Sequence, residues 1–476
     1  MDRSSTDVLV GRGSLRDEMA GADLGDDRLN ARRNQLLTVL ERSPDKGFPE
    51  ACSNDADMEA LYRFLRNRRV SLAAVVEPHL EATSARCRAF DEVLVIHDTT
   101  EMSFAREQVG PGLTRLGPRR QGFWVHTSLA VSAEGLRAPL GLVAMAPFTR
   151  QPATAPKPRW RERFHDPRKE SRRWADGVAA VRGRIGEATR AIHVMDREGD
   201  SYELLAALTA HGDRYVVRVH YDRSVVTADV NEPTRLSDLR ARVSVCVTQK
   251  VTVAPRRAEN RAQRLAFPAR DGRVATVSFA ACPVIVQRPR DHRSSALPAT
   301  LAAHVVFGWE AQPPAGEAPV EWSLVTTEPI DTPEQVLRIV AWYRTRWLIE
   351  EFFKCLKTGC AYEQRQLESL DTLLVALALL APIAWQLLLM RHLARDLPDA
   401  RATVALTSRQ ITILRTTPVG KHLSLAPSIR DALLVVARLG GHLRQNGEPG
   451  WLVLARGMQT LRLMETGWAA AEAAHM

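Results

Sequence analysis

The sequence predicts a mixed α/β protein, with a sheet-containing core flanked by helical domains at both ends of the chain. Two apolar, β-branched runs, residues 92–98 and 191–196, each end in an aspartate. Strands of this kind are typical of buried α/β sheets, which gather functional side chains where strands end. The third observation is a run of polar residues at helical spacing within residues 342–357. With 476 residues, the chain is too long for one hydrophobic core, and we expect two or three domains.

The first segment, residues 1 to about 75, is predicted to be helical and basic. Acidic residues at positions 26 and 27 open one helix, and Ser53-Asn54-Asp55 caps a second, as helix dipoles and N-capping preferences favour. The two helices carry a set of arginines: Arg28, Arg32, Arg33, Arg63, Arg66, Arg68 and Arg69. A basic face of this kind binds a polyanion or is simply solvated, and the pattern alone leaves both interpretations open.

Residues 90–221 are predicted to hold the core of the sheet. Between the third and fourth strands, residues 157–174 mix cations with tryptophans, which suits a nucleic-acid backbone or an ordinary surface loop equally well. The expected strands are 92–97, 123–132, 138–147, 191–196 and 214–221, with a helix near 176–189.

The second half of the chain is predicted to begin with a β-rich insertion at about 222–325, where turn residues separate short alternating runs. Residues 332–357 are expected to form one helix, opened by a Thr-Pro-Glu signal, and residues 368–476 are expected to be helical. Residues 372–390 carry no charge, but Pro382 and Gln386 interrupt the run. We therefore expect a helix buried in the core and no membrane span.

The helix predicted at 332–357 carries a polar stripe on one face. Its members stand three, four and seven residues apart: Tyr343, Arg346, Glu350 and Lys357. Such side chains are costly to bury, and a carboxylate between two cations and a phenol suits a metal ion beside a phosphodiester. The alternative is a solvated helix face with ion pairs between successive turns.

Three carboxylates, Asp98, Asp196 and Glu350, favour the first interpretation. Each aspartate alone is weak evidence, because Asp also caps helices and starts turns. Together with Glu350 they form an ordered set of hard oxygen donors, which suits Mg²⁺ or Mn²⁺. The six cysteines contain no C-x-x-C pair, which predicts reduced thiols and no zinc site.

The composition is that of an ordinary globular protein, with 45% hydrophobic and 25% charged residues. The net charge of +10, from 65 Lys+Arg against 55 Asp+Glu, favours a polyanionic partner such as nucleic acid. Because the first residues lack the apolar segment of a secretory signal, we expect a cytoplasmic protein that joins the nucleoid when bound to DNA.

Taken together, these motifs resemble a known family. Asp-Thr-Thr after the first strand, Asp-Arg-Glu after the fourth strand and Tyr-x2-Arg-x3-Glu-x6-Lys on a helix are similar to the DDE cut-and-paste transposases. The closest resemblance is to the transposon-five-like branch of the bacterial insertion-sequence-four family. The resemblance extends over nearly the whole chain, with further similar stretches at residues 61–67, 122–126, 169–171, 214–218, 322–329 and 437–441.

The resemblance implies an RNase-H-like catalytic core and three domains. These are a helical DNA-end-binding domain at 1–75, a catalytic domain at 76–367 that includes the β-rich insertion, and a helical dimerisation domain at 368–476. It also implies a catalytic and metal-binding triad that holds two Mg²⁺ ions, with Mn²⁺ as a substitute: Asp98, Asp196 and Glu350.

The resemblance further implies contacts to double-stranded DNA. Trp322 would stack on a base that is extruded when a hairpin forms, although a half-buried core tryptophan is the alternative. The phosphate contacts implied near the cleaved end are Tyr343, Arg346 and Lys357. The contacts implied for the end sequence are Arg28, Arg32, Arg63 and Arg66.

The activity implied is metal-dependent cut-and-paste transposition: nicking at the transposon end, hairpin formation and opening, and strand transfer into target DNA. Two other functions remain open, an RNase-H-like DNA nuclease without strand transfer and a non-catalytic DNA-binding inhibitor of transposition. The basic N-terminal helices and the presence of all three acids favour the transposase.

A homodimer on DNA is also implied, because two transposon ends must be held together. The last segment offers apolar residues at roughly helical spacing: Trp451, Leu454, Met458, Leu461 and Met464. The same spacing is equally consistent with a stripe that packs back on its own protomer.

Overall fold

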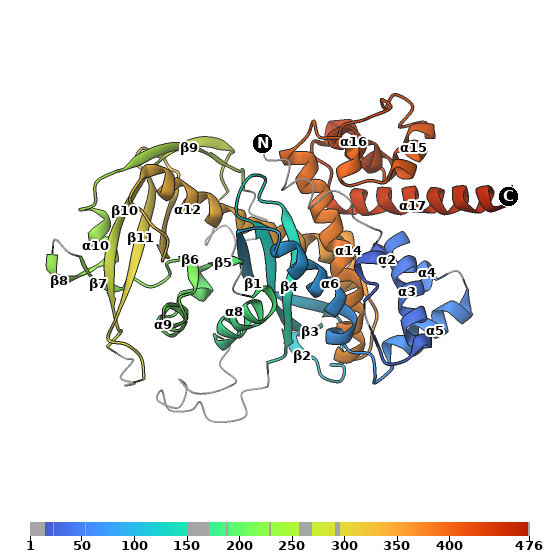
Figure 1. Ribbon diagram of the computed structural model, residues 1–476, viewed down its shortest axis with the longest axis horizontal. Helices are drawn as coiled ribbons and strands as arrows, with labels where there is room; N and C mark the ends of the chain where they lie inside the picture. The colour runs from blue at the N-terminus through green and yellow to red at the C-terminus, as the bar shows by residue number, and fades with distance from the viewer. Residues whose placement is uncertain are drawn as a thin grey trace. The chain divides into compact units, whose positions relative to one another are not determined.

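The computed structural model describes residues 15–21, 23–52, 54–150, 171–186, 189–227, 230–256, 269–290 and 296–474. The chain folds into two compact units. The first comprises Met1–Lys157, Gly177–Arg190 and Trp347–Met476, and the second comprises Pro158–Asp176 and Ala191–Arg346. Figure 1 labels most of their helices and strands.

The fold is mixed α/β, as the sequence predicts. Twelve strands lie in the described part of the chain, and helical segments precede the first strand and follow the last. Apart from the short elements β2 and η1, the central elements follow one another as three strands, a helix, a strand, a helix and a strand: β1, β3, β4, α8 (Arg172–Ile185), β5, α9 and β6. This succession is the element order of an RNase-H-like core.

An antiparallel sheet organises the first unit. It contains β1 (Glu92–Ala105), β2 (Thr114–Gly117), β3 (Arg120–Ser132) and β4 (Pro139–Phe148), with β3 paired to each of the other three. The prediction that the first strand ends near Asp98 is wrong. Strand β3 continues alongside β1, so that Asp98 pairs with Thr127 in mid-strand.

Two long helices, α6 (Leu72–Cys87) and α14 (Leu370–Asp396), pack against each other and against β4 (Figure 1). Among the described residues, α14 is the one helix that is long and apolar enough to cross a membrane, with a mean hydropathy of 2.3, and 89% of its apolar window is buried inside the fold. A helix that is apolar on all sides suits the centre of a large core, as predicted for this segment.

The N-terminal part of the first unit is helical. It contains α2 (Leu15–Glu18), α3 (Asp27–Arg42), α4 (Phe48–Ala51) and α5 (Asp55–Leu65). Asp26 caps α3 and Asn54 caps α5 through side-chain acceptance of backbone N–H groups. These caps are the ones that the acidic and Asn-Asp stretches predict.

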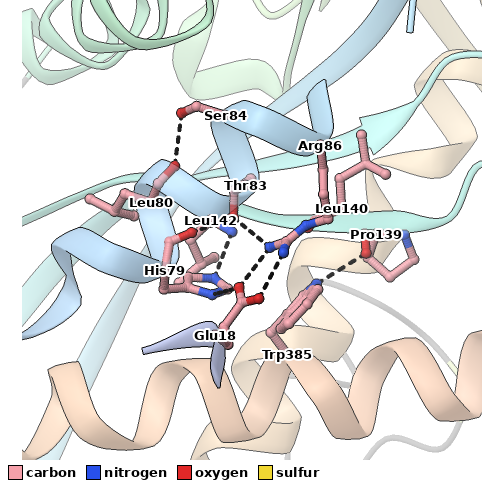
Figure 2. A network of polar contacts seen from close by, with 10 residues as sticks. All are labelled: Glu18, His79, Leu80, Thr83, Ser84, Arg86, Pro139, Leu140, Leu142 and Trp385. Atoms are coloured by element: carbon pink, nitrogen blue, oxygen red, sulfur yellow. Dashed lines mark hydrogen bonds and ion pairs between the residues drawn. The ribbon is translucent and has the colours of Figure 1, made fainter. Parts of the chain in front are cut away.

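A buried polar network ties α2 to the rest of the unit (Figure 2). The Glu18 carboxylate accepts hydrogen bonds from His79 Nδ1 and from both terminal nitrogens of Arg86, each at 2.8 Å. His79 Nε2 accepts the Leu142 N–H at 3.1 Å, and Arg86 Nε donates to the Leu140 carbonyl at 2.7 Å. The network therefore joins α2, α6 and β4 around one carboxylate.

The C-terminal part of the first unit is helical. It contains α13 (Trp347–Lys354), the π-helical η2 (Cys355–Gly359), η3 (Tyr362–Gln364), α14, η4 (Ala402–Val404), α15 (Ser408–Thr416), α16 (Ile429–Leu439), η5 (Arg444–Asn446) and α17 (Trp451–Ala474). Helix α17 packs against α16, η2 and α3, and Arg462 on α17 pairs with Glu41 on α3 at 2.7 Å.

The apolar stripe predicted on α17 is mostly buried within its own chain. Trp451, Leu454, Met458 and Leu461 are each less than a tenth exposed, whereas Met464 is 39% exposed. The stripe is therefore chiefly part of this protomer's core, the second of the two interpretations that its spacing allows. Beyond Leu461, three large apolar residues of α17 face solvent: Leu463, Met464 and Trp468.

The second unit is a mixed sheet with a few helices. Its elements are β5 (Arg190–Met195), η1 (Arg197–Gly199), α9 (Tyr202–His211), β6 (Arg214–Arg218), β7 (Ser224–Thr227), β8 (Val230–Arg235), α10 (Leu236–Arg240), β9 (Val247–Val253), β10 (Arg273–Gln287), β11 (Thr300–Glu310), β12 (Glu321–Thr326) and α12 (Pro333–Thr345). Strands β5 and β6 are parallel, and β6, β12, β11 and β10 follow as antiparallel neighbours. The predicted β-rich insertion corresponds to β7–β12.

The single helix predicted at 332–357 is interrupted at two places. The Arg346 N–H bonds to the Tyr343 carbonyl, three residues back, where α12 ends. The Cys360 N–H bonds to the Cys355 carbonyl, five residues back, which makes η2 a π-helical turn. Hydrogen bonds three or five residues apart tighten or widen a helix locally, and π turns are frequent at functional sites.

Candidate active site and nucleic-acid pocket

Asp98 lies half-buried on β1 of the first unit. Its Oδ1 atom accepts the backbone N–H of Thr99 at 2.8 Å, and the Thr99 hydroxyl lies 2.9 Å from His126 Nδ1 on β3. His97 precedes Asp98 and could be mistaken for a general base. It is fully buried, and its Nδ1 atom lies 3.0 Å from the Ser128 hydroxyl. The structure therefore accounts for His97 as a satisfied strand histidine.

Glu350 lies half-buried on α13, also in the first unit. Helix α13 packs against β1, so the elements that carry Glu350 and Asp98 are in direct contact. Lys357, seven residues beyond Glu350, donates from Nζ to the Glu101 carbonyl of β1 at 2.6 Å and lies 3.6 Å from Glu363. The neighbouring Glu351 pairs with Arg395 at 3.1 Å.

Asp196 belongs to the second unit and directly follows β5, as predicted. It is half-buried, and its carboxylate accepts the Glu198 N–H at 2.8 Å as the cap of η1. Tyr343 and Arg346 are half-buried residues of the same unit, at the end of α12. Asp98 and Glu350 thus lie on two elements of the first unit that pack against each other. Asp196 lies at the end of a strand in the second unit.

The donor chemistry of these positions suits a hard divalent cation. Asp98, Asp196 and Glu350 offer carboxylate oxygens, the ligands that Mg²⁺ and Mn²⁺ favour. Within the described ranges, no group of three or more His, Cys, Asp or Glu side chains is already arranged to hold a metal ion. All six cysteines are free, and burial raises the pKa of the Cys355 thiol well above its usual value, which disfavours a thiolate ligand.

A pocket of about 440 Å³ lies within the second unit, beside the residue that follows Asp196. Volumes of this order are typical of ligand sites. Aromatic and cationic side chains contribute to its wall: Arg197, Arg218, His220, Tyr221, Arg240, Phe307 and Trp322. Two acidic residues, Asp222 and Glu321, also line it, so its three arginines leave a small excess of positive charge. Stacking surfaces beside cations are the combination found where proteins bind single-stranded nucleic acid.

Trp322 is the predicted site residue in this wall. It lies half-exposed on β12, opposite Gly308 of β11, and its ring meets Phe279 edge-on at 5.8 Å. In the described part of the chain, no acceptor lies within hydrogen-bond reach of the buried Trp322 Nε1 or Arg218 Nε. Buried donors without partners are rare, and a ligand with acceptor oxygens or ring nitrogens would satisfy both.

Sequence reasoning missed several residues of this pocket, namely Arg218, His220, Tyr221 and Arg240. Arg218 ends a strand that runs parallel to β5, so the argument that singled out Asp196 at a strand end applied to Arg218 as well. No sequence pattern singled out Tyr221, because a single tyrosine after a strand is common. Only the fold brings it to the same pocket as Trp322.

The arginines predicted to contact DNA ends lie on α3 and α5. Arg28, Arg63 and Arg66 are exposed, and Arg32 is half-buried. Arg63 pairs weakly with Glu59 at 3.6 Å, and Arg66 reaches Glu368 at 3.4 Å. These are surface pairs that contribute little stability, so they leave the cations available to a polyanion.

One member of the predicted basic set, Arg33, does not belong to this face. Its side chain is 1% exposed and bonds to Asn34, and burial lowers the pKa of its guanidinium. Helical periodicity places Arg32 and Arg33 about a quarter-turn apart, so one arginine reaches the surface while the next is carried into the core.

Two family models match this chain. Residues 12–70 match the transposase DNA-binding domain, and residues 168–385 match the transposase DDE domain. The second match includes Asp196 and Glu350, whereas Asp98 precedes it. The chain therefore carries a transposase DNA-binding domain followed by a transposase DDE domain.

A cryo-EM structure of a piggyBac transposase synaptic complex with hairpin DNA is similar to this chain at 9% sequence identity. The likeness covers 83% of this chain and 72% of that one, with a TM-score of 0.36. A TM-score this low does not define a shared fold.

Proposed function

We propose that this protein is a DNA transposase that binds transposon ends and carries out metal-dependent cut-and-paste transposition. The proposal extends to the transposon-five-like branch of the insertion-sequence-four family, on the strength of the Tyr-Arg-Glu-Lys motif. The observation that carries it is the joint presence of a DNA-binding domain and a DDE domain in one chain. Its steps are nicking, hairpin formation and opening, and strand transfer.

Asp98, Asp196 and Glu350 are the proposed ligands of two Mg²⁺ ions, which Mn²⁺ can replace. Bound there, the ions would supply activation of a water or 3′-hydroxyl and stabilisation of the leaving oxygen. The nearby carboxylates are poorer candidates. Asp200 is buried and fully engaged, and Glu351 is paired with Arg395.

The proposed DNA contacts follow the chemistry of the side chains. Tyr343, Arg346 and Lys357 hold phosphates near the cleaved end, and arginine adds a forked contact to phosphate oxygens. The pocket beside Asp196 receives an extruded base, which stacks on Trp322. Its surrounding cations neutralise the phosphates that flank such a base.

End recognition is assigned to the helical N-terminal segment. Four arginines of α3 and α5 contact the phosphates of the end duplex: Arg28, Arg32, Arg63 and Arg66. Three of them are exposed and the fourth is half-exposed, and all lie in the region that matches the DNA-binding domain. The protein acts on double-stranded DNA in the cytoplasm and joins the nucleoid when bound.

The proposed active assembly is a homodimer that holds two ends. Because most of the α17 stripe is buried in its own chain, the partner contact is assigned to the exposed residues beyond it: Leu463, Met464 and Trp468. Exposed apolar side chains grouped on one helix end are a common feature of association surfaces.

The experiment is an excision assay with purified protein. One plasmid carries a marker gene between the two DNA segments that flank this gene. The reaction also contains Mg²⁺ and a second plasmid as target. The proposal expects hairpin-ended excised DNA and then marker insertion into the target. Cleavage without insertion would indicate a nuclease, and retention of end DNA without any cleavage would indicate a non-catalytic inhibitor.

A further inference from the structure

Asp200, four residues beyond Asp196, is the centre of a buried polar cluster in the second unit. Asp200 is 1% exposed. Oδ2 accepts the backbone N–H groups of His220 and Tyr221 at 2.6 and 3.0 Å, and Oδ1 accepts from Arg223 Nη2 at 2.5 Å. One carboxylate therefore holds two successive main-chain N–H groups of the turn that follows β6.

Arg223 completes the cluster from the other side of the turn. Its guanidinium also donates to the Asp200 carbonyl at 2.7 Å and lies 5.4 Å from the centre of the Tyr221 ring. Because Arg223 is 7% exposed and paired, its charge stabilises the turn and does not reach solvent. A buried ion pair with this many hydrogen bonds is costly to break, so the turn has one strongly preferred geometry.

The turn held in this way presents an aromatic side chain to the pocket. Tyr221 is 56% exposed, its ring meets His220 at 4.7 Å, and both residues line the cavity that Trp322 also lines. A mobile, exposed tyrosine would lose conformational entropy when a ligand stacks on it. Here the hydrogen bond to Asp200 fixes the Tyr221 main chain, and the Arg223 guanidinium and the His220 imidazole contact its ring. These contacts restrict the ring and lower the entropic cost of stacking a ligand on it.

We propose that Asp200 is a positioning residue that, through Arg223, holds Tyr221 as a second aromatic wall of this pocket, so that a nucleobase of single-stranded DNA is bound by Tyr221 as well as by Trp322. The inference rests on the proposed function, because it presumes that the pocket receives DNA. It adds Asp200 and Tyr221 to the three proposed metal ligands, and it gives Asp200 a role other than metal binding.

The charges around the pocket fit the same ligand. Three arginines line it, Arg197, Arg218 and Arg240. The two acidic residues of the lining are already engaged, Glu321 by Arg240 and Asp222 by Ser237. Two of the lining residues carry buried N–H donors without a protein acceptor in the described ranges, Trp322 and Arg218. A nucleotide supplies phosphate oxygens for the cations, a face for the aromatic rings and acceptor atoms for these donors.

The test uses the full-length protein and an eight-nucleotide thymidine oligonucleotide with one central 2-aminopurine. Stacking on an aromatic ring quenches this base, so affinity and quenching are read from one titration. Tyr221→Ala is expected to bind roughly tenfold more weakly and to lose part of the quenching, in line with the worth of one base–aromatic stack. Tyr221→Phe keeps the ring and is expected to restore both.

Asp200→Asn tests the positioning role, because it keeps the side-chain shape and removes the charge that pairs with Arg223. It is expected to reproduce the loss of quenching seen with Tyr221→Ala. The matched control is Glu328→Gln, which disrupts another buried carboxylate–arginine pair of the same unit, with Arg214 at the start of β6, whereas the pocket lies at the end of that strand. It is expected to leave quenching unchanged, so equal losses in both variants would overturn the inference.

Failure of this inference can be told apart from failure of the proposed function. If wild type quenches, Trp322→Ala abolishes quenching, and both Tyr221→Ala and Asp200→Asn retain it, the pocket binds a base without a second wall and only this inference fails. If wild type itself shows no quenching, the pocket is no nucleotide site, and the inference falls together with the base-binding part of the proposed function.

Discussion

Lys357 Nζ donates a hydrogen bond to the main-chain carbonyl of Glu101 at 2.6 Å. The two residues are 256 positions apart in the chain, yet the bond ties the turn after α13 to strand β1. Glu101 is three residues from Asp98 and Lys357 is seven from Glu350. The bond therefore helps to hold the helix of one proposed metal ligand against the strand of another.

Lys357→Met is expected to lower DNA cleavage by roughly ten- to a hundredfold, because a charge-assisted hydrogen bond contributes about 1.5–3 kcal/mol. The measurement is the rate of end cleavage in Mg²⁺ with thermal unfolding monitored in parallel. Lys354→Met, which changes an exposed lysine at the end of the preceding helix α13, is the matched control. An equal loss in that variant would show that general positive charge, and not the contact with β1, is responsible.

Asp98→Ala, Asp196→Ala and Glu350→Ala are each expected to reduce cleavage at least about a thousandfold while end binding is retained, since each removes a proposed metal ligand. Chelation of divalent ions is expected to have the same effect on wild type. Cleavage and duplex retention are measured on the same samples. The control is Glu351→Ala, whose carboxylate is engaged by Arg395, and full cleavage by any of the three variants would remove that residue from the site.

Combined replacement of Arg28, Arg32, Arg63 and Arg66 by alanine is expected to weaken binding of the end duplex and to flatten its salt dependence. Each lost phosphate contact lowers the slope of log affinity against log salt by about 0.9. Binding is measured from about 50 to 200 mM salt, the range in which such slopes are usually determined. Arg119→Ala, an exposed arginine outside these helices, is the control, and an unchanged slope in the quadruple variant would mean that this face is merely solvated.

Glu18→Gln is expected to destabilise the protein at neutral pH. Burial alone would raise the pKa of Glu18, but hydrogen bonds from His79 and Arg86 outweigh it and lower the pKa to about 2. A carboxylate with a depressed folded-state pKa stabilises the fold above its unfolded pKa, and this contribution is lost as pH falls towards 2. The shift corresponds to about 3 kcal/mol.

Urea unfolding at pH 7 and at pH 3 measures this effect. The difference between wild type and Glu18→Gln is expected to be large at pH 7 and clearly smaller at pH 3. Glu59→Gln, which breaks an exposed pair with Arg63, is expected to change stability by less than about 1 kcal/mol at either pH. A pH-independent difference for Glu18→Gln would indicate lost packing and not lost charge.

Replacing Leu463, Met464 and Trp468 by serine is expected to spare binding to a single end and to eliminate the complex that holds two ends. Truncation of α17 would be a poor test, because Leu454 and Leu461 are fully buried in this protomer. Native gel electrophoresis with labelled end DNA separates the two complexes. Leu425→Ser, which changes another exposed apolar residue, is the control, and paired ends formed by the triple variant would place the partner contact elsewhere.

The sequence by itself determined the elements whose cause is local. The β-branched runs before Asp98 and Asp196 form β1 and β5, the caps at Asp26 and Asn54 start α3 and α5, and the uncharged run within α14 is buried in the core. These features depend on hydrogen bonds and apolar periodicity within a few residues, so a pattern in the sequence suffices to predict them.

The tertiary structure alone decided which similar residues differ in role. Asp196 and Asp200 lie four residues apart, but one is half-buried at a strand end and the other is enclosed by Arg223 and a distant turn. Likewise, Arg32 is half-exposed and Arg33 is buried, and the apolar stripe of α17 covers its own core. Burial and ion pairing depend on partners that the fold brings from far along the chain, so no local pattern specifies them.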